Sequence, residues 1–411
     1  MSDRSVDSPY AWFRLLIAVA LSAIGGVGMW SVVVALPAVQ ADFHAERGAA
    51  SFPFTLAMIG FGVGGVVMGR LADRKGIVLP ASIGVAALGA GYILASFANG
   101  LGTFAIAYMI IAGLGTAATF SPLIADISCW FEKRRGIAVA LAASGNYISG
   151  AIWPTVIETG IRTHGWRTTH LAVGIVCLVT MPLLVVLLRG PRPTAATGMT
   201  AAKAVRRIQL PPRVLQSLLA AAGLACCVAM SMPQVHIVAY CGDLGYGPAR
   251  GAQMLSLMLA FGIISRIGSG FLADRFGGLI TLAVGSAAQG VALLLYLSMD
   301  GLTSLYVISA LFGLFQGGLV PSYAIIIREN YPASEAGGRV GLVMMMTLLG
   351  MALGGWMSGV IFDLTGSYRA AFANGVLWNA INLSISLFLL TRSNLTLPRS
   401  ATAPRAESAA G

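Results

Sequence analysis

Twelve predominantly apolar stretches, each about 20 residues long, run through this chain and constrain its fold more than any other feature. A helix of that length crosses the hydrocarbon core of a bilayer once. Because a backbone surrounded by lipid must satisfy its own hydrogen bonds, each stretch is expected to be helical. The stretches lie at about 12–39, 50–69, 77–98, 103–125, 136–158, 169–188, 214–241, 251–272, 278–299, 303–327, 339–361 and 370–391. The sequence therefore predicts an all-α integral membrane protein with twelve transmembrane helices.

The composition excludes a soluble globular domain. Of the 411 residues, 57% are hydrophobic and 10% are charged, whereas about a quarter of a soluble protein is charged. The 51 glycines suit membrane helices, because small residues let such helices pack closely. The five cysteines have no metal-ligand spacing, and the chain has no phosphate loop and no nucleophile motif. We therefore expect no enzymatic activity, no bound metal and no cofactor.

The positive charges are distributed unevenly between the two sides of the predicted helices. With the N-terminus placed in the cytoplasm, 20 of the 26 Lys and Arg residues fall in cytoplasmic segments and five fall outside. Membrane proteins keep such an excess of positive charge on the cytoplasmic side. The net charge of +11 is therefore a topology signal, the lipid bilayer is the expected partner, and nucleic acid is not. We expect a multi-pass protein of a bacterial inner membrane with both termini in the cytoplasm.

The chain repeats itself at an offset of about 200 residues. The longest cytoplasmic connection is rich in proline and basic residues and has six predicted helices on either side. The block Gly-Arg-Leu-Ala-Asp-Arg-Lys-Gly at 69–76 returns as Gly-Phe-Leu-Ala-Asp-Arg-Phe-Gly at 270–277, and Pro122 is repeated as Pro321. Such self-similarity indicates a duplication. The predicted organisation is a six-helix bundle at 1–189, a linker at 190–213, a second six-helix bundle at 214–392 and a tail at 393–411.

The repeated block resembles the hallmark loop of the major facilitator superfamily, and the resemblance covers nearly the whole chain. It implies two pseudo-symmetric bundles that rock around a central site near the middle of the bilayer. Within each block, glycine permits close helix approach and a tight turn, and aspartate caps a helix or pairs with an arginine. The resemblance assigns the block to the cytoplasmic gate, in which the gating residues are Gly69, Asp73, Arg74, Gly270, Asp274 and Arg275.

Two further passages indicate a branch of that superfamily. Residues 130–138 and 359–372 resemble blocks of the monocarboxylate porter family and its oxalate/formate antiporter relatives. The chain departs from that family in span one, which lacks both the acid before the glycine run and a lysine. It also has Gly262 where the porters carry an Asp, and no cation at 340–361. These departures disfavour dicarboxylate substrates and the family's route of proton coupling.

Arg266 is the only Lys or Arg predicted to lie deep within a span. A cation at that depth costs at least about 2.5–3.5 kcal/mol on insertion scales, so it is expected to face a cavity and meet an anion. The planar guanidinium matches a carboxylate in a bidentate way, and no acid is predicted at comparable depth. The resemblance also places a substrate-binding arginine at this position of span eight. The competing interpretation is that Arg266 extends toward the cytoplasm and pairs with Asp73 or Asp274.

Seven other residues within the spans are weaker candidates for substrate contact. Polar side chains in membrane helices most often bond to a neighbouring helix, so packing competes with substrate binding at each of them. An aromatic residue lines the cavity of the resembling family at the position of Phe120. The imidazole of His236 titrates near neutral pH, which makes it a candidate proton carrier. The seven candidates are Phe120, Asn146, Tyr147, His236, Gln316, Tyr323 and Asn382.

These observations favour a secondary transporter of a small organic monocarboxylate, a lactate- or pyruvate-like anion, that works by alternating access as a monomer. Protons are the candidate coupling ion. The alternative is a multidrug or other metabolite exporter of the same fold, although exporters of cationic drugs tend to bury an acid in the cavity. A receptor without transport activity would usually need an appended domain, and the terminal segments of about 11 and 20 residues are too short for one.

Overall fold

The computed structural model describes residues 6–132, 134–190 and 208–393. Twelve helical segments in these ranges are long and apolar enough to span a membrane, which confirms the predicted fold class. The segments are Pro9–Asp42, Arg47–Lys75, Val78–Ser96, Leu101–Trp130, Gly136–His164, Trp166–Leu187, Pro212–Asp243, Pro248–Phe276, Gly278–Ser298, Leu302–Asn330, Glu335–Thr365 and Tyr368–Thr391.

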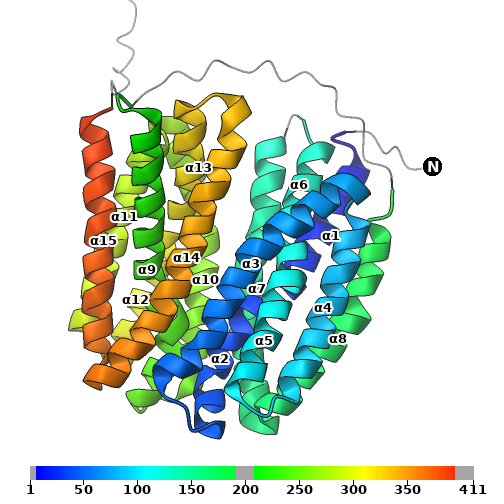
Figure 1. Cartoon of the computed structure of the whole chain (residues 1–411), viewed down its shortest axis with the longest axis vertical. Helices are drawn as coiled ribbons and strands as arrows, with labels where there is room; N and C mark the ends of the chain where they lie inside the picture. Colours follow the sequence, from blue (N-terminus) through cyan, green and yellow to red (C-terminus); the bar gives the residue numbers. More distant parts are fainter. Residues whose placement is uncertain (1–5, 133, 191–207, 394–411) are drawn as a thin grey trace, which may run out of the picture.

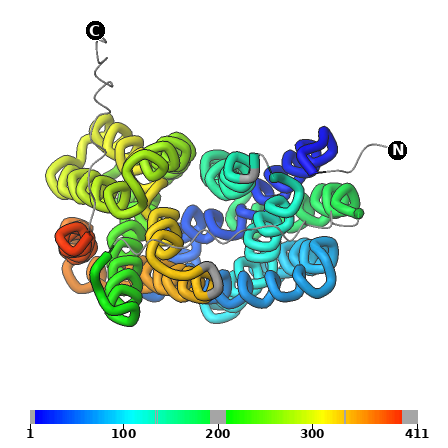
Figure 2. The backbone as a smooth tube through the Cα atoms, turned by 90° about the horizontal axis from the view of Figure 1, so that it is seen from above, coloured from blue at the N-terminus to red at the C-terminus, as the bar shows by residue number. Residues whose placement is uncertain are grey.

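The twelve spans form two bundles that lie side by side (Figures 1 and 2). The N-terminal bundle contains α1 (Pro9–Gly25), α2 (Val27–Asp42), α3 (Arg47–Lys75), α4 (Val78–Ser96), α5 (Leu101–Ile110), the π-helix η1 (Ile111–Thr116), α6 (Ser121–Trp130), α7 (Arg135–His164) and α8 (Trp166–Leu187). The C-terminal bundle contains α9 (Pro212–Asp243), α10 (Pro248–Phe276), α11 (Gly278–Ser298), α12 (Leu302–Gln316), α13 (Leu319–Asn330), α14 (Ala333–Thr365) and α15 (Tyr368–Thr391).

The chain enters the first bundle, leaves it, enters the second and leaves that one at the same end of the molecule, at the top of Figure 1. We call this end the linker face, and the end where α2, α9 and α14 finish the opposite face. Both copies of the repeated block form the last turns of helices that finish at the linker face, since Lys75 ends α3 and Phe276 ends α10. The predicted linker lies largely at 191–207, which is outside the described residues.

Three of the predicted spans are interrupted rather than continuous. Span one breaks at Gly26, between α1 and α2, where the Thr116 hydroxyl donates to the Gly25 carbonyl oxygen at 2.8 Å. Span four passes through η1 and breaks before α6, and span ten breaks between α12 and α13. A freed backbone group within a membrane helix must find another partner, and Thr116 supplies one. Apolar periodicity alone does not show these breaks, because every segment remains apolar.

Glycine brings these interrupted spans into contact with their neighbours at equivalent places in the two bundles. A side chain at Gly64 of α3 would collide with the backbone of Gly113 in η1. A side chain at Gly313 of α12 would likewise collide with the backbone of Met258 in α10. Gly113 and Gly313 are themselves related by the repeat. Close backbone approach at both positions therefore requires glycine.

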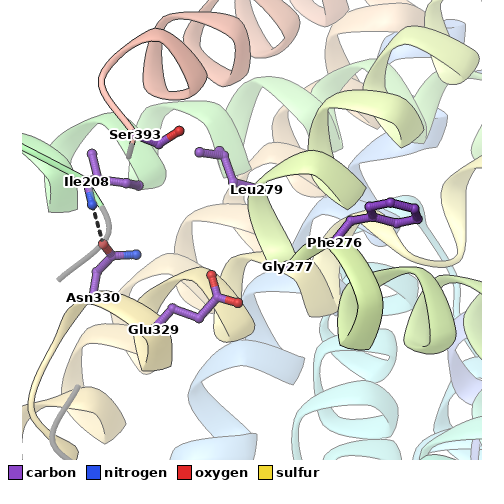
Figure 3. A pocket seen from close by; sticks show the side chains of 7 residues that line it. All are labelled: Ile208, Phe276, Gly277, Leu279, Glu329, Asn330 and Ser393. Carbon is purple, nitrogen blue, oxygen red and sulfur yellow. Dashed lines mark hydrogen bonds between the residues drawn. The ribbon is translucent and has the colours of Figure 1, made fainter. Parts of the chain in front are cut away.

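A compact set of contacts anchors the described end of the linker to the C-terminal bundle (Figure 3). The Ile208 amide donates to the Asn330 side-chain oxygen at 2.9 Å, and Ile208 forms an antiparallel bridge with Ser393. The Tyr331 hydroxyl donates to the Pro212 carbonyl oxygen at 2.7 Å. The pocket enclosed here measures about 10 Å³, which is room for about one water molecule. This place is therefore an anchor for the chain and too small for an organic substrate.

Arg14 is buried inside the first span rather than in a loop. Its side chain is 1% exposed, and its Nε donates to an Asp126 carboxylate oxygen at 2.8 Å. Its Nη1 donates to the Leu188 carbonyl oxygen at 2.8 Å, and its guanidinium lies 4.7 Å from the centre of the Trp130 ring. The sequence assigned this residue to the basic cytoplasmic segments, so Arg266 is not the only arginine buried within a span.

Candidate functional site

Arg266 lies between the two bundles, on the side of α10 that meets α7. Its Nη1 donates to the backbone oxygen of Ala143 at 3.3 Å, and its guanidinium lies 4.8 Å from the centre of the Tyr147 ring. The Nε atom is buried without a hydrogen-bond partner. Within the described ranges, no carboxylate forms an ion pair with Arg266. This guanidinium therefore retains the capacity to bind an anion.

The position of Tyr147 is fixed by a glycine on the facing helix. A side chain at Gly262, one turn before Arg266, would collide with the Tyr147 ring. The break in span ten lies against the backbone of the same glycine. A Cβ at Gly317 would lie 2.5 Å from the Gly262 backbone oxygen. The absence of a side chain at Gly262 therefore lets α7 approach α10 next to Arg266, and the absence of one at Gly317 lets span ten approach the same place.

Asn146 and Trp30 extend this cluster to a third helix. Ala143, Asn146 and Tyr147 lie on one face of α7, because residues three and four apart in a helix are neighbours. The Trp30 indole nitrogen, on α2, donates to the Asn146 backbone oxygen at 3.3 Å. The Asn146 Oδ1 atom is buried without a partner. We call Arg266, Asn146, Tyr147 and Trp30 the central cluster.

Trp30 was missed by sequence reasoning. The signal that could have found it is an indole directly after the glycine run of span one. A buried tryptophan usually directs its N–H to a partner, and here the partner is the helix that carries Asn146 and Tyr147. A side chain at Gly150 would lie 2.9 Å from the Trp30 indole nitrogen, so another glycine makes room for this contact.

Gln316 lies close to the central cluster but bonds within its own bundle. It ends α12 at the break, next to Gly317, and its side-chain oxygen accepts from the Gln234 amide at 2.9 Å. The Gln316 Nε2 atom is buried without a partner. Three candidate residues thus each have one buried polar atom without a partner. The three atoms are Arg266 Nε, Asn146 Oδ1 and Gln316 Nε2. Such atoms are uncommon in native proteins and indicate places where a ligand or water completes the bonding.

The structure places two other candidates in the interior of the C-terminal bundle. The Tyr323 hydroxyl donates to the Asn382 side-chain oxygen at 2.9 Å, and the Asn382 amide donates to the Ser286 hydroxyl at 2.9 Å. Tyr323 and Asn382 are both fully buried, and these bonds join α13, α15 and α11. Phe120 lies at the break in span four, where its ring is 5.9 Å from that of Phe61. None of the three joins the contacts around Arg266.

A network of charged groups joins the two bundles at the opposite face. Both Asp363 carboxylate oxygens accept from the N-terminus of α3, from the Arg47 amide at 2.8 Å and the Gly48 amide at 2.6 Å. The Arg47 guanidinium donates to both oxygens of Asp243, at 2.9 and 3.2 Å, and to the Tyr368 hydroxyl at 2.7 Å. We call these five residues the Arg47 lock. Arg47 and Gly48 belong to the N-terminal bundle, and the other three belong to the C-terminal bundle.

His236 contacts the Arg47 lock through Tyr368 and does not contact the central cluster. Its Nδ1 is 2.9 Å from the Tyr368 hydroxyl, and its Nε2 is 2.8 Å from the Gly355 carbonyl oxygen. His236 lies seven residues before the end of α9 at the opposite face, whereas Arg266 lies eighteen residues beyond the start of α10 at that face. At about 1.5 Å of rise per residue, these depths differ by about 16 Å.

The predicted gating residues Asp73 and Asp274 are free of such contacts at the linker face. Asp73 and Asp274 are both exposed, and in the described part of the chain neither forms a hydrogen bond or an ion pair. The Arg275 guanidinium lies 5.4 Å from the centre of the neighbouring Phe276 ring. Arg266 is therefore not paired with Asp73 or Asp274 in this structure.

A cavity of about 310 Å³ lies nearer the opposite face, between α2, α7 and α10. Its lining includes Pro37, Pro248 and the pair Glu158 and Arg162, whose charged atoms are 3.7 Å apart. The carboxylate is thus partly neutralised by a neighbour on its own helix. Among the described residues, no group of three His, Cys, Asp or Glu side chains is arranged to hold a metal ion.

Comparison with known proteins places these features in a family. The family model described as Major Facilitator Superfamily matches residues 17–305 and 269–410. Monocarboxylate transporter 13 of Rattus norvegicus is 30% identical over 79% of this chain and 74% of its own length. Monocarboxylate transporter 11 of Homo sapiens is 28% identical over 90% of this chain and 82% of its own length.

The architecture is also that of a solved transporter. The structure of a bacterial homolog of the human lysosomal transporter Spinster has a TM-score of 0.67 and 13% identity, over 94% of this chain and 96% of that one. At this identity the likeness concerns the fold. The family model, the curated relatives and the paired six-helix bundles agree that the chain belongs to the major facilitator superfamily and resembles its monocarboxylate branch.

Proposed function

We propose that the protein is a secondary transporter of a small organic monocarboxylate, a lactate- or pyruvate-like anion, and has no enzymatic activity. The observation that carries the proposal is Arg266, a half-buried guanidinium between the bundles with one unpartnered nitrogen and no carboxylate paired to it. An arginine in such a place suits a carboxylate, because the planar fork donates two parallel hydrogen bonds. The relatives named as monocarboxylate transporters support the same substrate class.

The remaining groups of the central cluster, together with Gln316 beside it, define how the anion would be held. The Tyr147 ring lies against the guanidinium and restricts its orientation. The unpartnered Asn146 oxygen and Gln316 nitrogen offer an acceptor and a donor to the rest of a small molecule. Tyr323, Asn382 and Phe120 are left out of this site, because their contacts are made elsewhere in the bundles.

Alternating access then takes the form of rocking between the bundles at 1–189 and 214–392, joined by the linker at 190–213. The excess of positive charge on one side supports a bacterial inner-membrane protein with both termini and the linker face in the cytoplasm. The Arg47 lock is then the periplasmic gate, and the repeated blocks form the cytoplasmic gate. We propose that the protein works as a monomer, with protons as the coupling ion.

Uptake by proteoliposomes tests the substrate class. Purified protein would be reconstituted and offered labelled lactate, pyruvate, oxalate and a cationic dye, with and without a pH gradient. Accumulation of the monocarboxylates alone, increased by an inward proton gradient, is the expected result. Transport of the dye without transport of any carboxylate would contradict the proposal and favour the exporter alternative.

Equilibrium binding to purified variants tests the role of Arg266. Arg266→Gln should weaken binding of the transported acid by about ten- to a hundredfold, because a charge-assisted contact contributes about 1.5–3 kcal/mol. Arg266→Lys should also bind poorly, since a point charge replaces a bidentate fork. Arg250→Gln is a matched control, because Arg250 lies on the same helix and, among the described residues, its side chain bonds only to Gln253, at 3.3 Å. Wild-type affinity in Arg266→Gln would remove Arg266 from the site.

A further inference from the structure

We infer that His236 is a proton-binding residue that controls the Arg47 lock, so that the opposite face closes around a neutral imidazole and opens when the imidazole is protonated. The inference deepens the proposed function by naming a coupling residue. It requires that the protein alternates between two states and does not depend on which solute it carries.

One assignment of protons satisfies every hydrogen bond that joins His236 to the lock. The Gly355 carbonyl oxygen can only accept, so His236 Nε2 must carry a hydrogen and donate to it. The Arg47 guanidinium can only donate, so the Tyr368 oxygen accepts from it. The Tyr368 hydroxyl hydrogen then donates to His236 Nδ1, which must be without a hydrogen. The closed lock is therefore complete with a neutral His236.

Protonation of His236 would break this sequence of donors and acceptors. A hydrogen on Nδ1 would point at the Tyr368 oxygen, and the Tyr368 hydrogen would have to turn toward a new acceptor. The carboxylates nearby are already occupied, since Asp243 accepts twice from Arg47 and Asp363 accepts from two backbone amides. The Tyr368 oxygen contacts both groups, so the new imidazolium would lie close to the Arg47 cation. Like charges in a poorly hydrated setting repel strongly.

Two carboxylates close to His236, Asp243 and Asp363, partly offset the repulsion between the two cations, so the effect of protonation comes mainly from the lost hydrogen bonds. The aromatic neighbour of His236 is Tyr368, whose ring centre is 5.4 Å from that of the imidazole. The ring centre of Tyr240 is 5.5 Å from that of Tyr368. Phe362 lies under the Arg47 guanidinium at 4.5 Å. Among the described residues, the titratable or charged groups that lie around this site on the helices packed here are Arg47 on α3, Tyr240 and Asp243 on α9, Asp363 on α14 and Tyr368 on α15. Because the lock joins both bundles, its weakening favours separation of the bundles at the opposite face.

The N-terminal bundle contains a matched histidine that serves as an internal control. His170 Nε2 is 2.6 Å from the Tyr108 hydroxyl, and its Nδ1 is 2.7 Å from the Trp166 carbonyl oxygen. It is buried like His236 and lies between the same two kinds of group. All of its partners belong to one bundle, so its protonation cannot pull the two bundles apart directly.

The test measures the separation of the bundles at the opposite face as a function of pH. Spin labels would be placed at Thr103→Cys and Leu364→Cys, which are exposed positions near that face in different bundles, in a Cys129→Ser background. Distances would be recorded in reconstituted full-length protein at pH 8 and pH 5, without substrate. Acidification should raise the ratio of open to closed states by about tenfold, equivalent to about 1.4 kcal/mol.

The variants separate His236 from other titrating groups. His236→Gln should stay closed at both pH values, because its amide can donate to Gly355 and accept from Tyr368 without being protonated. His170→Gln should open on acidification as the unsubstituted protein does. Opening that persists unchanged in His236→Gln, or no opening in the unsubstituted protein, would overturn the inference.

A second measurement covers the case in which His236→Gln does not fold. Nitrogen NMR of histidine-labelled, otherwise unsubstituted protein reports the protonation of His236 directly. An imidazole that stays neutral at a pH where the opposite face has opened would also overturn the inference. Failure of carboxylate uptake would leave these results unaffected, so the inference and the proposed function fail independently.

Discussion

The two ends of the molecule are held in different ways. At the opposite face, five residues from both bundles form charged and hydrogen-bonded contacts around Arg47. At the linker face, Asp73 and Asp274 are exposed and have no partner among the described residues. The difference shows that the two ends are not held by copies of one set of contacts. Charged contacts join the bundles at the opposite face, whereas the carboxylates of the repeated blocks are free in this conformation.

The repeat itself makes the difference clearer. Asp42 and Asp243 occupy equivalent positions at the ends of α2 and α9, 201 residues apart. Asp42 pairs with Arg167 inside the N-terminal bundle, whereas Asp243 pairs with Arg47 of the other bundle. Arg369, the repeat equivalent of Arg167, pairs with Asp300 instead. Of two equivalent aspartates, one thus pairs within its own bundle and the other pairs across the two bundles.

The largest expected effect comes from removing the centre of the lock. Arg47→Gln should shift the protein toward opening at the opposite face by about 2–3 kcal/mol, or roughly 30- to 150-fold. The reason is that Asp243 loses its cation and Tyr368 loses its donor together. Spin-label distances between the bundles would measure the shift. A closed opposite face in Arg47→Gln would show that apolar packing alone holds this gate.

A smaller and more selective effect is expected from the two equivalent aspartates. Asp243→Asn should favour opening by about 1.5 kcal/mol, because one charge-assisted contact is weakened. Asp42→Asn is the matched control and should leave the equilibrium between states unchanged, since its partner lies in the same bundle. Equal responses from the two variants would mean that net charge at this face, rather than the contact between bundles, sets the equilibrium.

A hydrogen bond within one bundle should affect stability without affecting the gates. Tyr323→Phe removes the donor to Asn382 and should lower the free energy of unfolding by about 1 kcal/mol. Substrate affinity and the separation of the bundles should not change. Thermal unfolding in detergent together with equilibrium binding provides the test, and a loss of affinity would return Tyr323 to the substrate site.

The smallest effect on stability is expected at the linker face. Asp73→Asn should change the free energy of unfolding by less than about 0.5 kcal/mol, because the side chain is exposed and unpartnered here. Turnover should nevertheless fall several-fold with affinity nearly intact, because the block acts on the conformation in which this face is closed. A large loss of affinity with unchanged exchange would contradict a gating role.

The fold could be predicted from the sequence because each membrane helix appears as a long apolar run and the repeat appears as a recurring motif. The breaks at Gly26 and between α12 and α13 could not be predicted, since glycine is common throughout these spans. Arg266 could be singled out by its isolation in an apolar run. Trp30 and the Arg47 lock could not be found in the same way, because their partners lie up to several hundred residues away and depend on how the bundles meet.

The pairing of Arg14 with Asp126 has a consequence for how the chain is made. The two residues are 112 positions apart, so the first span must enter the membrane before its buried partner has been synthesised. During that interval Arg14 remains an exposed cation at the end of a nascent helix, where it helps to orient that helix. Once Asp126 has been synthesised, Arg14 pairs with it and becomes part of the protein interior. The Arg14 side chain therefore acts first during membrane insertion and later in stabilising the folded bundle.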